Sequence, residues 1–293
     1  MAVEVQNNVV MKEVLLFSDK NGRALSNLDL LNALRDLKAD QTDVLYIHSS
    51  LSFGIPNPEL KKKELLQAIV ETILELGVKT VCMPTFTFSF CNGKTYDPVT
   101  AVSKMGVLNE YFRKQSEVIR SIDPLMSVAL YGEDRDLVEG IGHSSCGANS
   151  TFDKLRHRDN VKFLFLGPKI GDCLTYMHYL EWLFSVDYRY ERKFVGDVVV
   201  NGDVKREEYD LFVRYNGVLP NTASYQYEER MYDKNVARIV MFGDSSISIV
   251  DKDVATTEYK KCLDENPHFF VDFKDGHLCQ DKTFILDKEM VAM

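Results

Sequence analysis

The stretch Val44-Leu45-Tyr46-Ile47-His48-Ser49-Ser50 decides the fold, because an apolar run changes abruptly into polar side chains. A short apolar run that ends in this way is typical of a buried strand entering a loop. Residues 59–76 follow with apolar side chains at helical spacing, and Gly77 is a natural C-cap. Thr80-Val81-Cys82-Met83 is the next apolar run, and Pro84 ends it. These segments begin an alternation of buried strands and helices.

The alternation continues along the chain and then changes. Strands are predicted at 128–131 and 161–166, and helices at 107–114, 136–139 and 174–184, the last with Asp172 as its N-cap. From residue 188 onward we expect strands at 188–200, 204–215 and 238–250, with a hairpin turn at Asn201-Gly202-Asp203, and a closing helix at 251–264. This order predicts a mixed-sheet α/β sandwich. No linker-like change of composition divides the chain, so residues 1–293 are expected to form a single domain.

The composition is that of an ordinary globular protein, with 45% hydrophobic and 27% charged residues among 293. Acidic residues outnumber basic ones by 44 to 35, which gives a formal net charge of −9 at pH 7. A protein that binds a phosphate backbone normally carries a basic excess, so nucleic acid is not an expected partner. No run approaches the roughly 18 apolar residues of a membrane span. The six cysteines form no CxxC pair, and we expect a soluble cytoplasmic protein with reduced thiols.

Several familiar chemistries lack their sequence motif. The chain has no GxxxxGK(S/T) phosphate loop and no strand-linked GxGxxG for a dinucleotide. It also has no HExxH, no His/Cys cluster at metal spacing and no GxSxG nucleophile elbow. A metal site is therefore not predicted.

Four polar clusters follow predicted strands, where open α/β sheets usually place their ligands. They are His48-Ser49-Ser50-Leu51, Pro84-Thr85-Phe86-Thr87, Arg120-Ser121 with Ser127, and Asp172 to His178 with Glu181. In the last cluster His178 and Glu181 lie three residues apart on a predicted helix and can touch. An imidazole oriented by a carboxylate is suited to take a proton from an amine nucleophile. A polar, hydrogen-bonded histidine on an otherwise apolar helix is the structural alternative.

Each of the other clusters also has two interpretations. Residues 48–50 are typical of a loop that binds a phosphate through hydroxyl and backbone N–H groups. They are also typical of residues that cap the N-terminus of the next segment. Arg120 beside Ser121 can clamp a phosphate through its guanidinium, or it can be a surface arginine in a turn. Cys146 and Cys173 are alternative thiol nucleophiles, but nothing nearby in the sequence predicts the lowered pKa that this role needs.

Taken in order, these clusters resemble the antibiotic N-acetyltransferase family, the aminoglycoside 3-N-acetyltransferase-like proteins. The resemblance is clear from about Val44 to Glu181 and weaker to the closing helix. It rests on His48-Ser49-Ser50-Leu51, Met83 to Thr87, Met105 to Glu110 with Phe112-Arg113, Arg120-Ser121 with Pro124 and Ser127, Leu164 to Gly167, and Thr175-x-x-His178-x-x-Glu181. The resemblance implies a mixed-sheet α/β sandwich of the antibiotic N-acetyltransferase type, not the GNAT fold. It also implies transfer of an acyl group from acyl-coenzyme A to a primary amine on a sugar-like molecule.

The resemblance also assigns roles to residues of this chain. His178 corresponds to the catalytic base, Glu181 and Asp172 to acids that orient it or contact the substrate, and Thr175 to a residue close to the acyl group. The residues implied for coenzyme A are His48, Ser49, Ser50, Leu51, Thr85, Arg120, Ser121 and Ser127. The donor is expected to be acetyl-CoA or another acyl-CoA, without a metal.

Three functions are open at this level. The first is an N-acyltransferase, above all an N-acetyltransferase, acting on an amino sugar such as a nucleotide-linked sugar for surface polysaccharide synthesis. The second is an aminoglycoside 3-N-acetyltransferase that confers antibiotic resistance. The third is a non-catalytic acyl-CoA-binding protein, against which the presence of both His178 and Glu181 argues.

The acceptor pocket is expected in the segment 187–235. A polycationic aminoglycoside favours carboxylates there, and a nucleotide diphosphate favours arginine or lysine. The segment carries both kinds, namely Asp187, Glu191, Glu228 and Glu229 with Arg189, Arg192, Arg214 and Arg230. For either enzyme we expect direct transfer, with the amine losing its proton to His178. The expected partner is a small-molecule amine, and the protein is a monomer or homodimer with no membrane partner.

Overall fold

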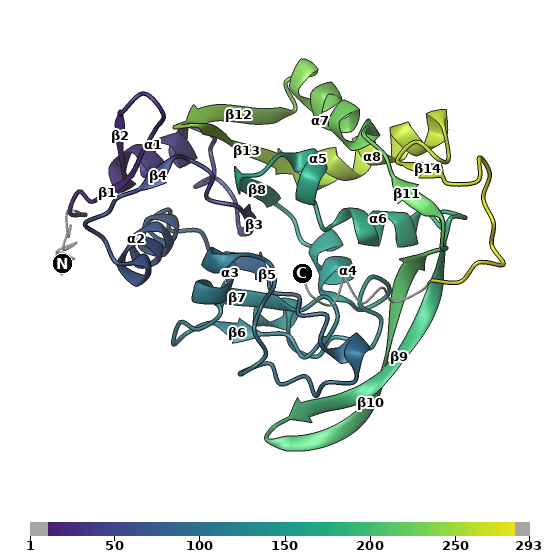
Figure 1. Ribbon diagram of the computed structural model, residues 1–293. Helices are drawn as coiled ribbons and strands as arrows, with labels where there is room; N and C mark the ends of the chain where they lie inside the picture. The colour runs from purple at the N-terminus through teal and green to yellow at the C-terminus, as the bar shows by residue number, and fades with distance from the viewer. Residues whose placement is uncertain (1–10, 285–293) are drawn as a thin grey trace, which may run out of the picture.

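A seven-stranded mixed sheet forms the centre of the protein in the computed structural model, which describes residues 11–284 (Figure 1). Its strand order is β12-β13-β8-β3-β5-β7-β6. β3 (Val44–Ser49) is parallel to both of its neighbours, β8 (Val161–Gly167) and β5 (Thr80–Pro84). The outer strands are antiparallel, namely β12 (Ala237–Phe242), β13 (Ser245–Asp251), β7 (Val128–Gly132) and β6 (Ile119–Arg120). The predicted mixed-sheet α/β class is confirmed.

Helices cover both faces of this sheet, because side chains along each strand alternate between the faces. In β3, Leu45 and Ile47 enter one core and Tyr46 enters the other. The first core is shared with α1 (Asn27–Asp36), α2 (Lys62–Leu74) and α3 (Val107–Phe112). The second is shared with α4 (Thr151–Arg156), α5 (Ile170–Cys173), α6 (Met177–Leu183), α7 (Ala223–Asp233) and α8 (Lys252–Glu265). Short 3-10 turns occur at Phe90–Asn92 and Arg135–Leu137.

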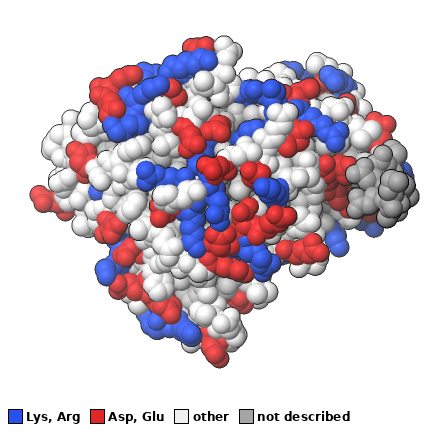
Figure 2. Space-filling model, turned by 180° about the vertical axis from the view of Figure 1, so that it is seen from behind, with Lys and Arg blue, Asp and Glu red and all other residues white. Residues whose placement is uncertain are grey.

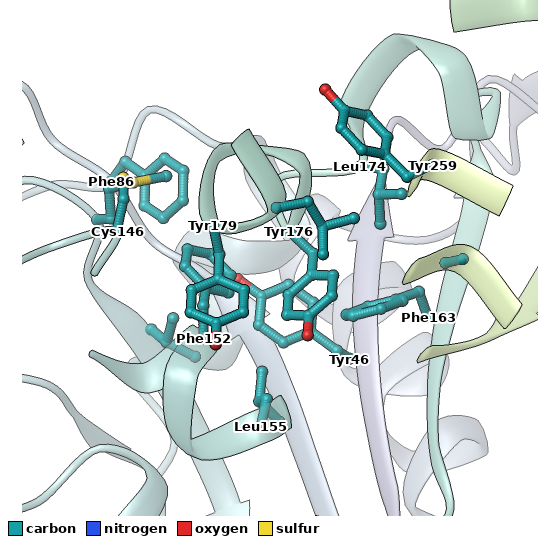
Figure 3. Close-up of a cluster of buried hydrophobic side chains, with 14 of the residues drawn as sticks. Tyr46, Phe86, Cys146, Phe152, Leu155, Phe163, Leu174, Tyr176, Tyr179 and Tyr259 are labelled. Atoms are coloured by element: carbon teal, nitrogen blue, oxygen red, sulfur yellow. Dashed lines mark hydrogen bonds between the residues drawn. The ribbon is translucent and has the colours of Figure 1, made fainter. Parts of the chain in front are cut away.

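Aromatic rings fill the core between the sheet and α6 (Figure 3). Tyr46 of β3 and Phe163 of β8 meet Phe152 of α4 and Tyr176, which directly precedes α6. The centroids of neighbouring rings lie 5.0 to 6.1 Å apart, and all four rings are fully buried. Tilted and edge-to-face contacts at such distances stabilise a core beyond simple burial. This layer supports the segment that leads into α6.

A long two-stranded ribbon curves along one side of the molecule (Figure 1). It consists of β9 (Arg189–Val200) and β10 (Asp203–Arg214), joined at Asn201 and Gly202, which both have positive φ. This confirms the predicted hairpin, because an Asn-Gly pair with positive φ is the preferred two-residue turn. The pairing register places Arg189 directly opposite Arg214 at the open end of the ribbon.

Two small sheets complete the fold. The first contains β1 (Leu15–Ser18), β2 (Ala24–Ser26) and β4 (Ile55–Pro56), and the second contains β11 (Val218–Pro220) and β14 (Val271–Phe273). The helices predicted at 59–76, 107–114 and 251–264 are present as α2, α3 and α8, each with ends within three residues of the prediction.

The strand predicted at 238–250 is wrong as a single element. The chain instead forms the hairpin of β12 and β13, which turns at Gly243 with a φ of +61°. A Cβ at this glycine would lie 2.1 Å from the carbonyl oxygen of Phe53, so the turn requires glycine. The sequence marks this turn by Gly243-Asp244-Ser245-Ser246, a break between two apolar segments that the single-strand prediction overlooked.

The helix predicted at 174–184 is interrupted. α5 ends at Cys173, and α6 begins only at Met177. Asp172 is not the N-cap of α6, because it is the third residue of α5 and its carboxylate accepts the N–H of Lys169 at 3.3 Å. The segment predicted as a helix at 136–139 forms only the 3-10 turn at Arg135–Leu137.

The surface shows mixed charge. Figure 2 shows Lys and Arg interspersed with Asp and Glu, without an extended basic area on that face. Within residues 11–284, none of the helices combines the length and the apolar character needed to cross a bilayer.

Candidate active site

A cavity of about 380 Å³ lies beyond the carboxyl ends of β5 and β8. Its apolar wall contains Phe86, Phe88, Met105, Leu174, Met177, Phe270 and Val271. Its polar wall contains Asp172, Thr175, His178, Glu181, Arg189, Arg214, Asn221 and Ser224. A cleft beyond the carboxyl ends of the strands is where α/β sheets usually bind ligands. The structure therefore brings all four residues predicted for catalysis to the wall of one cavity.

His178 and Glu181 lie on α6 as the spacing predicts. Nδ1 of His178 is 3.7 Å from Oε2 of Glu181, and the His178 side chain is 40% exposed. The side chain of Glu181 is only 6% exposed. The imidazole is accessible, while the carboxylate behind it is shielded from water.

Arg189 completes this group from the first position of β9. Its Nη2 donates to Oε2 of Glu181 at 2.8 Å and lies 3.3 Å from Nδ1 of His178. Its Nη1 donates to the carbonyl oxygen of Phe212, and the hydroxyl of Tyr188 donates to the other oxygen of Glu181 at 3.0 Å. The carboxylate is thus held by one guanidinium and one phenol on its buried side.

These contacts determine the charges of the group. Burial raises the pKa of Glu181, but Arg189 and His178 more than offset this effect and lower the pKa to about 2. Burial lowers the pKa of His178, Glu181 partly restores it, and Arg189 and Arg214 lower it further. At neutral pH the site therefore holds an ionised carboxylate, a charged guanidinium and a neutral imidazole that is ready to accept a proton.

Thr175 is held by a residue predicted to bind coenzyme A. Nε2 of His48 is 3.0 Å from Oγ1 of Thr175, and it accepts the backbone N–H of Thr175 at 3.3 Å. The ring of His48 stacks on Phe165, and burial lowers its pKa to about 3. His48 is only 3% exposed. The neutral ring fixes the loop between α5 and α6 in this structure, and its predicted contact with coenzyme A stays a prediction.

Asp172 lies at the rim of the cavity and does not contact His178. Its Oδ1 accepts the hydroxyl of Tyr225 on α7 at 2.5 Å. Gly171 beside it packs closely on the same helix, because a Cβ there would lie 2.8 Å from the carbonyl oxygen of Ser224. In this structure Asp172 is bound to α7 through Tyr225 and does not orient the imidazole.

Four more residues predicted for coenzyme A form a buried structural cluster. The side chains of Thr85, Ser121 and Ser127 are fully buried in this structure. The guanidinium of Arg120 donates to Thr85 and Ser127 and to the carbonyl oxygens of Pro98 and Ala101. Each nitrogen of this guanidinium donates to an oxygen atom of the protein, so Arg120 joins β6 to the loop after β5. Its predicted contact with coenzyme A stays a prediction.

The loop after β3 is the accessible part of the predicted coenzyme A set. Ser49 donates to Asn109 at 2.8 Å, and the hydroxyl of Ser50 is exposed beside that of Ser52. The N–H groups of Ser50 and Leu51 donate to Leu166, so they do not form the free cradle that the sequence suggested. The hydroxyl of Ser50 is the group of this loop that remains available to a ligand.

The thiol alternatives do not fit. Cys146 is buried, and burial raises the pKa of its thiol to about 12. Burial also raises the pKa of Cys173, beside the cavity, well above its usual range. A thiol nucleophile needs the opposite shift. Among the described residues there is also no group of three His, Cys, Asp or Glu side chains placed to hold a metal ion.

Sequence reasoning named Arg189 and Arg214 only among the charges of the acceptor segment. The signal that could have placed them is the Asn201-Gly202 turn, because its register pairs residue 189 with residue 214. The contact between Arg189 and Glu181 had no comparable signal.

A family model described as aminoglycoside 3-N-acetyltransferase matches residues 46–264. The chain belongs to this family. The donor is accordingly acetyl-CoA, and the reaction is acetyl transfer. The matched range includes most of β3, the ribbon, nearly all of α8 and all the polar residues of the cavity lining; Phe270 and Val271 lie outside it. No curated protein matches the chain significantly.

Solved structures of similar fold include several enzymes of the same type. AAC-IIIb, in a binary complex with CoASH, superposes with a TM-score of 0.69 at 17% identity over 82% of this chain and 96% of its own. AAC-VIa bound to sisomicin superposes with a TM-score of 0.68 at 17% identity, over 82% and 98% of the two chains. YokD from Bacillus subtilis has a TM-score of 0.64 at 17% identity, over 80% and 93%. At such identities these neighbours support the fold.

The cavity fits the acetyl donor of the family. Phe86, Phe88 and Met105 form an apolar wall suited to an acyl group and a pantetheine arm, and His178 faces the same space.

Proposed function

We propose that this acetyltransferase acts on a primary amine of an amino sugar, with His178 as the base that takes the proton of the amine. One observation carries the proposal, namely an accessible neutral imidazole backed by the buried pair of Glu181 and Arg189. An amine attacks only when it has lost its extra proton, so a base at the site of attack accelerates transfer. Acetyl-CoA, when bound, supplies the activated acetyl group.

The tautomer of His178 follows from its neighbours. The carboxylate of Glu181 favours a proton on Nδ1, whereas the guanidinium of Arg189 favours a lone pair there. Arg189 lies closer to the carboxylate, at 2.8 Å against 3.3 Å to Nδ1, so its N–H is directed chiefly to Glu181. Nδ1 then keeps its proton, and Nε2, which makes no hydrogen bond with the described residues, is the basic atom.

Two further residues have supporting roles in this proposal. Thr175 lines the cavity one turn before His178, where its hydroxyl can contact the acetyl group. Asp172, exposed at the rim, is placed to attract an ammonium group of an incoming acceptor.

The identity of the acceptor is the finer question. The sequence put a nucleotide-linked amino sugar first, but the family model and the neighbours support an aminoglycoside-type acceptor better. AAC-VIa was solved with sisomicin, and AAC(3)-IVa was solved as a mutant with a gentamicin. Aminoglycosides are therefore the first acceptors to test, together with simpler amino sugars.

The test is release of the coenzyme A thiol from acetyl-CoA in the presence of a panel of amines. His178→Gln should lower kcat by about 10²- to 10⁴-fold, because it removes the base and little volume. His157→Gln is the matched control, since His157 is a largely exposed histidine at the end of α4. Retention of near wild-type kcat by the His178 variant would show that another group accepts the proton.

A further inference from the structure

Arg214 is the last residue of β10, and its side chain lines the cavity beside His178. Among the described residues it makes no hydrogen bond or ion pair, in contrast to Arg189 directly opposite it. Two like charges opposite each other on a ribbon repel, and this repulsion is strongest where water is scarce. A partly buried guanidinium without a partner is therefore a costly feature that the fold retains.

The acidic groups of the cavity do not compensate Arg214. Glu181 is engaged by Arg189 and by the hydroxyl of Tyr188. Asp172 lies at the exposed rim, where it accepts from Tyr225. Burial and the nearby charge of Arg189 lower the pKa of Arg214, and the charge of Glu181 offsets this effect only in part. The cavity lining thus holds two guanidiniums, of Arg189 and Arg214, and two carboxylates, of Glu181 and Asp172, but neither carboxylate is paired with Arg214.

Ser224 of α7 also lines the cavity. Its hydroxyl makes no hydrogen bond with the described residues, so it is a second donor that a ligand can use. The side chain of Asn221 on this wall is already committed, because it donates to Phe269 and accepts from Ala223. Arg214 and Ser224 are therefore the groups left to bind a ligand.

We infer that Arg214 and Ser224 bind an anionic group, a phosphate or a carboxylate, carried by the acceptor close to its reacting amine. The inference rests on the proposed function, since it takes His178 as the position of that amine. A guanidinium with free N–H groups is the preferred protein ligand for such anions. An acceptor with only ammonium groups would place like charge against Arg214, so we expect sisomicin to be used less well than an amino sugar that also carries an anionic group.

Coenzyme A is the other source of phosphate. Its pantetheine arm separates the phosphates from the thioester by a long chain of atoms. With the thioester at His178, the phosphates lie outside the inner cavity, and an anion at Arg214 comes from the acceptor. The experiment measures both sources.

The experiment compares glucosamine, glucosamine 6-phosphate and sisomicin as acceptors, with acetyl-CoA as donor. Glucosamine 6-phosphate should be preferred to glucosamine by at least tenfold in kcat/KM. Arg214→Gln should lower kcat/KM for the phosphorylated sugar by about 10- to 100-fold, because this is the loss expected when hydrogen bonds to a charged group are removed. Arg214→Lys should retain part of the preference. The matched control is Arg206→Gln on the same ribbon, because Arg206 is exposed and pairs with Asp197.

Four outcomes would overturn the inference while the proposed function stands. They are equal use of both sugars, a preference that survives in Arg214→Gln, an increase only in the KM for acetyl-CoA, and an equal fall of kcat for every acceptor. An increase only in the KM for acetyl-CoA would show that Arg214 binds the phosphates of the donor. An equal fall of kcat for every acceptor would show that Arg214 stabilises the charge that develops at the reacting carbonyl.

Absence of turnover with every amine would instead contradict the proposed function. Calorimetric binding of glucosamine 6-phosphate to the CoA-saturated protein then decides the inference separately. Binding that is lost in Arg214→Gln and kept in Arg206→Gln supports the anion site, and any other pattern rejects it. Thermal unfolding of each variant confirms that it is folded.

Discussion

Replacing Glu181 by Gln tests the buried charge group most directly. The change preserves the shape of the side chain but leaves the guanidinium of Arg189, only 7% exposed, without a counter-ion. Removing one partner of a buried ion pair costs about 3 to 5 kcal/mol. The lowered pKa of Glu181 gives a similar value independently, because a fall from 4.5 to about 2 corresponds to roughly 3 kcal/mol in favour of the ionised form.

The expected loss appears as a shift in thermal unfolding. An unfolding entropy of about 2.1 cal/mol/K per residue over 293 residues converts 3 to 5 kcal/mol into a fall in Tm of roughly 5 to 8 °C. Calorimetry and urea unfolding at pH 7 measure it. Glu229→Gln is the control, since Glu229 is exposed on α7 and should change stability by no more than about 0.5 kcal/mol.

A double variant separates stability from chemistry. Replacing Glu181 by Leu together with Arg189 by Met removes both charges, and it should recover most of the stability that Glu181→Gln loses. It should not recover turnover, because His178 then lacks the carboxylate that orients it. If Glu181→Gln unfolds within about 1 kcal/mol of the wild type, the carboxylate is not the counter-ion of Arg189, and our account of the site is refuted.

Three further predictions follow from the same contacts. Because burial lowers the pKa of His178, the acidic limb of the pH profile of kcat/KM should lie below the usual pKa of histidine. Glu181→Gln should move this limb to still lower pH, because it removes a negative charge that raises the pKa of His178. A limb above pH 7 would contradict this account. His48 has a folded pKa of about 3, so its contribution to stability is present above about pH 6.5 and is lost by about 1.4 kcal/mol per pH unit as the pH falls toward 3. Urea unfolding of the wild type and of His48→Gln between pH 7.5 and pH 5 measures the effect. The free energy of unfolding should fall with pH by this extra amount only in the wild type, and equal slopes in both proteins would exclude the effect. Arg120→Met should lower the free energy of unfolding by about 2 to 4 kcal/mol, because it leaves buried hydrogen-bond acceptors without their donor. The KM for acetyl-CoA of the folded variant should change little. A tenfold increase in that KM would show that Arg120 binds the donor.

Local spacing accounts for the parts of the site that were predicted correctly. His178 and Glu181 are three residues apart on one helix, so their contact needs no knowledge of the rest of the chain. The ribbon follows from the Asn201-Gly202 turn and its flanking strands. The hairpin of β12 and β13 was missed although Gly243-Asp244-Ser245-Ser246 interrupts the apolar residues and is a typical turn signal.

The coenzyme A residues show where such reasoning stops. Ser and Arg side chains after a strand are equally suited to a ligand and to the protein's own carbonyl oxygens. For Arg120 the choice depends on β5 and β7 being neighbours in the sheet, which brings Thr85 to Ser127 and both to the guanidinium. For His48 it depends on β3 lying beside β8, since the loop after β8 brings Thr175 within 3.0 Å.

The sequence by itself determined the alternation of strands and helices, the histidine–carboxylate pair on α6 and the family to which they point. These features depend on residues within a few turns of one another, whose geometry the backbone period sets. The tertiary structure alone decided which polar groups are buried and with which partners. It paired Glu181 with Arg189, committed Arg120 to carbonyl oxygens and placed Arg214 beside His178 without a counter-ion. The physical reason is that buried polar and charged groups must find partners within the fold. Only the groups that have no such partner are free to bind a ligand.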